Sequence, residues 1–175
     1  MDGDIKLTNT EPKHMEETIN KLRECGCSIK INNDSSICLI APEKLKSVDI
    51  ETEPYPGFPT DMQSIFVATL IQAQGISNIK ENIFENRYKY VPELRKMGVD
   101  IVQEDRKVRI TGENKIKATN LKAMDLRGGA ALVIAALQAK GTTEISNIEY
   151  ILRGYENLDK KLEKLGAKIK IEEKS

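Results

Sequence analysis

A carboxylate at the end of a proline-rich stretch is the first feature of this sequence that suggests chemistry. The segment 53–60 contains three prolines, each of which fixes φ at about −65° and disfavours helical geometry in the preceding residue. We therefore predict a shaped loop leading into an apolar helix over 62–74. Thr60 or Asp61 can cap the free backbone N–H groups at the helix start, and capping alone would explain Asp61. A carboxylate held there can also reach a substrate hydroxyl as a general base.

Arg127 is an arginine whose neighbours suggest ligand binding. It precedes the small residues 128–131, which would let a ligand approach the backbone closely. A buried helix is predicted over 130–138, and the positive end of a helix dipole favours anions. The planar guanidinium group suits phosphate and carboxylate groups. An arginine taken singly is more often a solvated surface residue, so the pattern leaves both interpretations open.

The cysteines and the single histidine do not form a recognisable metal or catalytic motif. Cys25, Cys27 and Cys38 are three thiols with one C-x-C spacing, whereas structural zinc sites use four thiolate or imidazole ligands at defined spacings. His14 lies in a polar segment without a partner for a catalytic dyad. We expect reduced thiols, buried or partly exposed, and we predict neither a metal nor a cofactor.

The composition predicts a soluble globular protein with a single domain over residues 1–175. Hydrophobic residues make up 39% of the sequence and charged residues 31%, and Lys+Arg and Asp+Glu number 27 each. Because neither sign forms a long run, nucleic acid is disfavoured as a main partner. No apolar run approaches the roughly 18 to 20 residues of a membrane span, and the N-terminus lacks a secretory pattern. We therefore expect a cytoplasmic protein without a membrane partner.

An internal repeat sets the expected fold. Three segments combine an amphipathic helix, a glycine able to adopt a left-handed conformation, and an alternating strand; they span 21–31, 93–102 and 161–171. Their glycines, Gly26, Gly98 and Gly166, are 72 and 68 residues apart. The apolar helices over 62–74 and 130–138 alternate with these segments and should be buried. The pattern indicates an α/β (α+β) protein of three pseudo-threefold units.

The predicted elements follow this repeat along the chain. We expect the apolar helices 62–74 and 130–138 and amphipathic helices near 12–25, 88–97 and 155–165. We expect strands at 4–7, 28–31, 37–40, 48–52, 78–80, 100–104, 107–111, 143–148 and 168–172.

Four motifs carry a family resemblance. The motifs are YPGFPTDMQ at 55–63, FENRY at 84–88, DLRGGAAL at 125–132 and RGYE at 153–156. With them the sequence resembles the C-terminal part of the UDP-N-acetylglucosamine 1-carboxyvinyltransferases, the enolpyruvyl transferases of the first committed step of peptidoglycan synthesis. The resemblance covers nearly all of the chain. It implies one domain of a two-domain fold, each domain built from three β-α-β-α-β-β units, here incomplete at its N-terminal edge.

The same resemblance implies the site residues. Asp61 would be the base that contacts the 3-hydroxyl of UDP-N-acetylglucosamine, and Ile83 would add a backbone contact to that ligand. Arg87, Arg127 and Arg153 would bind the anionic groups of phosphoenolpyruvate. We expect Asp61, Arg127 and Arg153 to be catalytic.

The sequence departs from the family in one respect that bears on activity. The family's N-terminal domain supplies a Lys-Asn pair and a mobile cysteine loop, and no matching segment exists here. We therefore expect this chain alone to be inactive. Two alternatives stay open, a non-catalytic metabolite-binding or interaction domain of the same fold, and a shikimate-pathway enolpyruvyl transferase.

Overall fold

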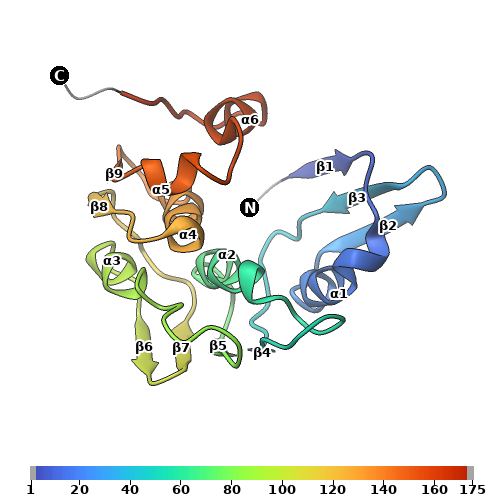
Figure 1. Cartoon of the computed structure of the whole chain (residues 1–175), viewed down its shortest axis with the longest axis horizontal. Coiled ribbons are helices and arrows are strands. Elements are labelled where there is room, and N and C mark those ends of the chain that lie inside the picture. Colours follow the sequence, from blue (N-terminus) through green and yellow to red (C-terminus); the bar gives the residue numbers. More distant parts are fainter. Residues whose placement is uncertain (1–2, 173–175) are drawn as a thin grey trace.

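The computed structural model describes residues 3–172 and arranges helices and strands in three repeated units (Figure 1). The second unit has all six expected elements in the predicted β-α-β-α-β-β order. Its members are β4 (Ile50–Glu51), α2 (Thr60–Leu70), β5 (Ile76–Lys80), α3 (Val91–Lys96), β6 (Ile101–Glu104) and β7 (Lys107–Thr111). The sheet has the order β4-β5-β7-β6, with β4 and β5 parallel and the other pairs antiparallel.

The first and third units have fewer elements in the described chain. The first unit forms an antiparallel sheet of order β1-β3-β2, and its elements are β1 (Asp4–Leu7), the 3-10 helix η1 (Pro12–Met15), α1 (Glu16–Glu24), β2 (Ser28–Asn32) and β3 (Ser36–Ile40). The third unit pairs two parallel strands, and its elements are β8 (Asn120–Lys122), α4 (Leu126–Ala136), β9 (Glu144–Ser146), α5 (Glu149–Leu152) and α6 (Leu158–Lys164).

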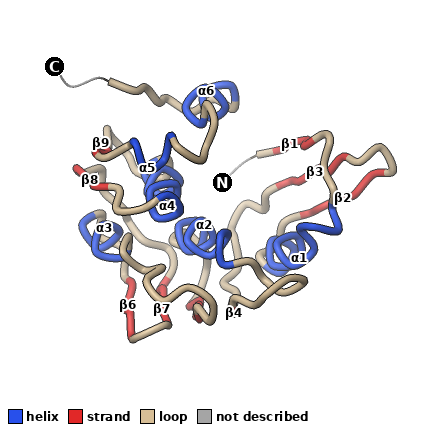
Figure 2. Tube along the Cα trace, viewed as in Figure 1, coloured by secondary structure: helices blue, strands red, loops and turns tan. Residues whose placement is uncertain are grey.

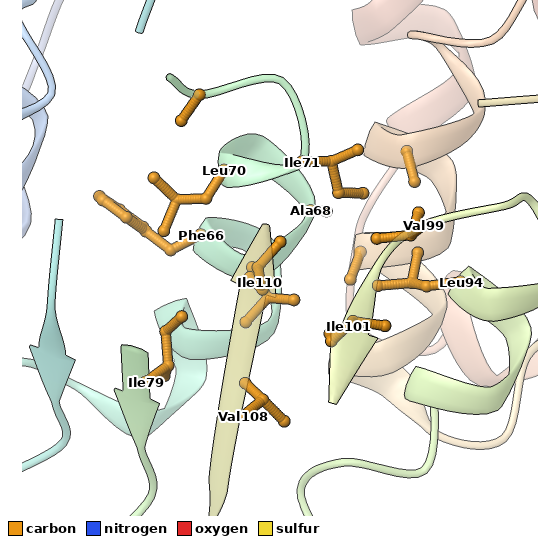
Figure 3. Packing of buried hydrophobic residues seen from close by; sticks show 14 of the residues in the cluster. Phe66, Ala68, Leu70, Ile71, Ile79, Leu94, Val99, Ile101, Val108 and Ile110 are labelled. Atoms are coloured by element: carbon orange, nitrogen blue, oxygen red, sulfur yellow. The ribbon is translucent and has the colours of Figure 1, made fainter. Parts of the chain in front are cut away.

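The core lies between the two apolar helices, which pack against each other, and the second sheet. Helices α2 and α4 occupy the middle of the molecule, with the helices and sheets of all three units around them (Figures 1 and 2). Alternating side chains of β5, β6 and β7 face α2 and α3, as Figure 3 shows, and Ile79 stands opposite Val108 as Ile101 does opposite Ile110. All four are at most 3% exposed. The predicted buried helices are therefore confirmed as the centre of the fold.

The glycine of each repeat ends its helix in the same way. Gly26, Gly98 and Gly166 have φ values of 98°, 88° and 94°, a left-handed conformation that glycine adopts at little cost. After each amphipathic helix, two consecutive amides turn back onto the last helical turn; they donate from Gly26 to Arg23 and from Cys27 to Leu22, and the same pattern recurs at 98–99 and 166–167. This is the Schellman arrangement, and its threefold recurrence confirms the repeat predicted from sequence.

Some predicted elements differ from the structure. The predicted strand 168–172 is wrong, because this extended segment has no partner strand within residues 3–172. An extended segment needs a neighbouring strand to satisfy its backbone groups, whatever its side-chain alternation. The short elements β8 and α5 were not predicted, and the strand expected over 143–148 ends at Ser146 because α5 follows.

Within residues 3–172, none of the helices has the length and apolar character that a membrane-spanning helix needs.

Candidate active site

The loop before α2 delivers Asp61 into the first turn of that helix. Pro59 is the N-cap residue, in an extended conformation with φ −73° and ψ 135°, and no side chain caps the helix. The predicted capping role of Thr60 and Asp61 is therefore wrong. The helix begins two residues earlier than expected, so both residues lie inside it and their side-chain oxygens meet partners on other elements.

Asp61 bridges two guanidinium groups. Its Oδ2 accepts a hydrogen bond from Arg127 Nη2 at 2.6 Å, and its Oδ1 accepts one from Arg87 Nη2 at 3.3 Å. The Asp61 side chain is 53% exposed, whereas that of Arg127 is 27% exposed and that of Arg87 is 9% exposed. The Asp61 carboxylate is therefore half exposed to solvent, while the two guanidinium groups that bind it are more buried.

The ion pair changes the acidity of both partners. The hydrogen bond from Arg127 holds the pKa of the Asp61 carboxyl below its usual value, with a further lowering by Arg87, although partial burial opposes it. The bond to Asp61 raises the pKa of Arg127. Asp61 is therefore ionised and is a weaker base while both guanidinium groups hold it.

The start of α4 fixes Arg127. Asp125 is the N-cap residue, and its carboxylate accepts a hydrogen bond from the Gly128 amide at 2.7 Å. The buried hydroxyl of Ser64 on α2 donates to the backbone carbonyl of Arg127 at 3.0 Å. Arg127 Nη1 donates to the Tyr155 hydroxyl at 3.0 Å, and its guanidinium group lies 5.4 Å from the centre of that ring. The backbone and side chain of Arg127 are thus held by the neighbouring helix α2 and by the segment after α5.

Arg87 lies in the segment between β5 and α3. Its Nε donates to the Thr60 hydroxyl at 3.2 Å, and its guanidinium group stacks 4.3 Å from the centre of the Phe84 ring. Asp61, Arg87 and Arg127 therefore form one cluster, although they come from three separate segments of the sequence.

Ile83 lies beside this cluster in an exposed turn. Its side chain is 41% exposed, and its amide donates to the carboxylate of Glu81 at 2.9 Å. Its backbone amide is therefore engaged within the protein, which leaves the carbonyl for any backbone contact with a ligand.

Arg153 is not bonded to the cluster. It is exposed at the end of α5, and its guanidinium group lies 5.6 Å from the centre of the Tyr150 ring. It lines a surface depression together with Gly154 and Tyr155, and Tyr155 is the residue that contacts Arg127. Arg153 thus lines a depression that it shares with Tyr155, and Tyr155 joins this depression to the cluster through Arg127.

Sequence reasoning missed Glu81, Ser64 and Tyr155. Each contacts a predicted site residue or its immediate support, and Glu81 and Ser64 are at most 1% exposed. A charged residue directly after a strand resembles a surface residue, so only its burial in the fold identifies Glu81. Tyr155 lies within the RGYE motif and could have been selected from it.

The three cysteines are free thiols, with Cys25 and Cys27 buried and Cys38 partly exposed, as predicted. Burial raises the pKa of the Cys25 thiol to about 12, with smaller contributions from its neighbours. Within residues 3–172, no group of three or more His, Cys, Asp or Glu side chains is arranged to hold a metal ion.

Comparison with known proteins places this chain in a family. The sequence profile described as EPSP synthase (3-phosphoshikimate 1-carboxyvinyltransferase) matches residues 1–162. The chain belongs to the enolpyruvyl transferase family. The resemblance carried by the four motifs is therefore confirmed at the level of the family, and the predicted fold class is confirmed with it.

Two relatives of this chain carry the same name. The UDP-N-acetylglucosamine 1-carboxyvinyltransferase of Desulfosudis oleivorans is 46% identical over 168 residues, which cover 96% of this chain and 40% of that protein. The protein of the same name from Desulfofundulus thermocisternus is 48% identical over 167 residues, which cover 95% of this chain and 68% of that protein. The chain thus spans about 40% of the first relative and about two thirds of the second.

Solved structures agree on the fold. The enolpyruvyl transferase NikO from Streptomyces tendae superimposes with a TM-score of 0.86 at 26% identity, covering 95% of this chain and 40% of that one. The EPSP synthase of Acinetobacter baumannii superimposes with a TM-score of 0.63 at 17% identity, which supports the fold alone.

Proposed function

We propose that this chain forms one domain of a cytoplasmic UDP-N-acetylglucosamine 1-carboxyvinyltransferase. The full enzyme would transfer the enolpyruvyl group of phosphoenolpyruvate to the sugar 3-hydroxyl and release phosphate. The observation that carries the proposal is the cluster of Asp61, Arg87 and Arg127, which places one ionised carboxylate between two cations on the surface of a family member. The similarity to relatives of this name at 44–48% identity supports the choice of sugar substrate.

Asp61 is the base in this proposal. The sugar hydroxyl must lose its proton as it attacks the central carbon of the enolpyruvyl group, whose methylene carbon gains a proton. Departure of phosphate and loss of a proton from the resulting methyl group then restore the double bond. A carboxylate that faces solvent from a helix start can accept the hydroxyl proton within hydrogen-bond distance. The two guanidinium groups keep Asp61 ionised before the substrate arrives.

The arginines bind the anionic substrate. Phosphoenolpyruvate carries a phosphate and a carboxylate, and each can take paired hydrogen bonds from a guanidinium group. When these anions draw Arg127 and Arg87 away from Asp61, the pKa of Asp61 rises toward its usual value and the carboxylate becomes a stronger base. Substrate binding would in this way activate the base. Arg153, exposed beside Tyr155, closes on the same anion.

The remaining groups of the reaction come from the other domain of the enzyme. The family's Lys-Asn pair and cysteine loop have no counterpart among the motifs of this chain, so the chain supplies one wall of the site. We expect no phosphate release from phosphoenolpyruvate and UDP-N-acetylglucosamine by the 175-residue chain alone. Turnover by the isolated chain would contradict this division of roles.

A hybrid enzyme tests the function directly. The 168 aligned residues of the Desulfosudis oleivorans relative are replaced by this chain, and phosphate release is measured with UDP-N-acetylglucosamine or with shikimate 3-phosphate as acceptor. We expect turnover with the nucleotide sugar and none with shikimate 3-phosphate. The opposite preference would assign the chain to the shikimate pathway.

A folded hybrid without turnover would favour the non-catalytic alternative. A measurement of UDP-N-acetylglucosamine binding then distinguishes a domain that recognises this substrate from one with an unrelated role. We expect UDP-N-acetylglucosamine to shift amide NMR signals near Asp61 and Ile83 in the 175-residue chain, and no shift at any concentration tested would reject the proposed substrate.

A further inference from the structure

Glu81 is a buried carboxylate that the reaction above does not use. It follows β5 directly and is 1% exposed. Its four hydrogen bonds in the structure come from neutral donors. Oε1 accepts from the Thr52 hydroxyl at 2.8 Å and from the amides of Ile83 and Phe84 at 2.9 Å each, and Oε2 accepts from the Thr60 hydroxyl at 2.9 Å. Burying a carboxylate is costly unless such bonds compensate for lost water, so a neutral side chain would serve stability as well or better.

One arm of this network shapes the exposed turn after β5. The amides of Ile83 and Phe84 both point at the Glu81 carboxylate, and the amide of Asn82 donates to the Thr52 hydroxyl at 2.8 Å. Three consecutive amides are thus turned toward the protein. Ile83 and Phe84 are 41% and 49% exposed, and the Phe84 ring packs against the Arg87 guanidinium group.

The other arm reaches Arg87 through a hydroxyl. The Thr60 hydroxyl donates a hydrogen bond to Glu81, and its oxygen accepts the hydrogen bond from Arg87 Nε at 3.2 Å. The guanidinium N–H of Arg87 can only donate, so the Thr60 oxygen accepts from Arg87 and the Thr60 O–H points to Glu81. Glu81 therefore orients Thr60, Thr60 orients Arg87, and Arg87 contacts Asp61.

We propose that Glu81 is a positioning residue, which sets Arg87 through Thr60 and the turn 82–84 through its backbone amides. It touches no substrate itself and acts on the residues that do. The inference rests on the proposed function for its kinetic consequence, and its structural consequence can be measured without that function.

The test compares two disruptions of the network with a rescue and a matched control. Glu81→Gln replaces an acceptor oxygen by an amide that donates, and Thr60→Val removes the hydroxyl that links Glu81 to Arg87. Thr60→Ser restores that hydroxyl. The control is Ser77→Ala, which removes a buried hydroxyl on the same strand, one that accepts from the Val48 amide at 3.1 Å and has no bond to the network.

In the hybrid enzyme, we expect Glu81→Gln and Thr60→Val to lower kcat/KM for phosphoenolpyruvate by about 10- to 10²-fold, the scale of a misplaced binding group. Thr60→Ser should keep most of the activity. Ser77→Ala should lower the unfolding temperature without changing kcat/KM. Equal losses of kcat/KM in Ser77→Ala and Glu81→Gln would reduce Glu81 to a structural role and overturn the proposal.

The 175-residue chain supplies the independent readout. The side-chain Nε–H signal of Arg87 should be resolved and protected from exchange in the unaltered chain and in Ser77→Ala, and should lose protection in Glu81→Gln and Thr60→Val. If the unaltered hybrid shows no turnover, the proposed function is contradicted. The exchange protection of the Arg87 Nε–H still tests the role of Glu81 in that case. An unchanged Arg87 signal in folded Glu81→Gln would overturn the inference.

Discussion

Helices α2 and α4 are equivalent elements of two successive units, yet their first turns differ. Each has 11 residues, and Asp61 and Arg127 are the second residues of their helices. The start of α4 is capped by Asp125, whereas α2 starts after Pro59 without a side-chain cap. The carboxylate that could have stabilised α2 is instead paired with the arginine of α4. One helix start is therefore built for stability, and the other gives up a cap to present a charged group.

The largest expected effect concerns the uncapped helix start. In the hybrid enzyme, Asp61→Asn keeps the size of the side chain but removes its charge, and we expect turnover to fall by about 10² or more because a positioned base is lost. Since Asp61 caps nothing, the unfolding temperature should change little. Phosphate release and thermal unfolding measure the two quantities, and an unchanged rate would remove Asp61 from the reaction.

A second substitution tests how closely α4 is packed. A Cβ atom built on Gly129 would lie 2.6 Å from Ile151 Cγ1 of α5, while Gln63 stands at the equivalent position of α2. We expect Gly129→Ala to destabilise the chain by about 1–3 kcal/mol through overpacking, measured by urea unfolding. Gly128→Ala is the control, because its nearest neighbours lie at 3.2 Å, and it should cost less. A stabilised Gly129→Ala variant would show that α5 moves freely away from α4.

The capped helix start gives a smaller effect. Asp125→Ala removes the bond to the Gly128 amide, so we expect a loss of about 1 kcal/mol, with Asp125→Ser recovering most of it. Thermal unfolding of the three chains measures the difference. If Asp125→Ala and Asp61→Asn lowered the unfolding temperature equally, the two helix starts would not differ in how they are stabilised.

The smallest effect is a pH dependence at Asp61. Because Arg127 lowers the pKa of this carboxyl in the folded chain, the pair stabilises the fold above the unfolded pKa of about 3.9. That contribution is lost as the pH falls through the lower folded value. The exposure of Asp61 keeps the effect small. The difference in unfolding temperature between the unaltered chain and Asp61→Asn should therefore vanish at low pH, and a difference that grows there would contradict the assigned direction.

The sequence predicted the repeated elements well because local signals determine them. The hairpin of β6 and β7 follows from alternation, and the helix ends at Gly26, Gly98 and Gly166 follow from glycine placement. The strand expected over 168–172 failed because pairing depends on a neighbour that local alternation does not report. The capping prediction failed because Asp61 and Arg127 lie 66 residues apart, and only the packing of α2 against α4 brings them together.

The sequence motifs predicted the charged residues of the site, but not the residues that hold them in place. Asp61, Arg87 and Arg127 came from motifs of a known family, and the structure brings these three together. Their roles in the reaction stay predictions, as do those of Ile83 and Arg153. Glu81 escaped sequence reasoning because its importance lies in burial and in the direction of four hydrogen bonds, which no spacing rule encodes.

The pairing of Asp61 with two arginines also bears on how the proposed reaction ends. Inorganic phosphate, once formed in the proposed reaction, would bind the same guanidinium groups that pair with Asp61. The Asp61 carboxylate, which is part of the same chain, would then compete with phosphate for Arg87 and Arg127. Re-formation of the two ion pairs would promote product escape, so the residue proposed to start the reaction would also empty the site for the next cycle.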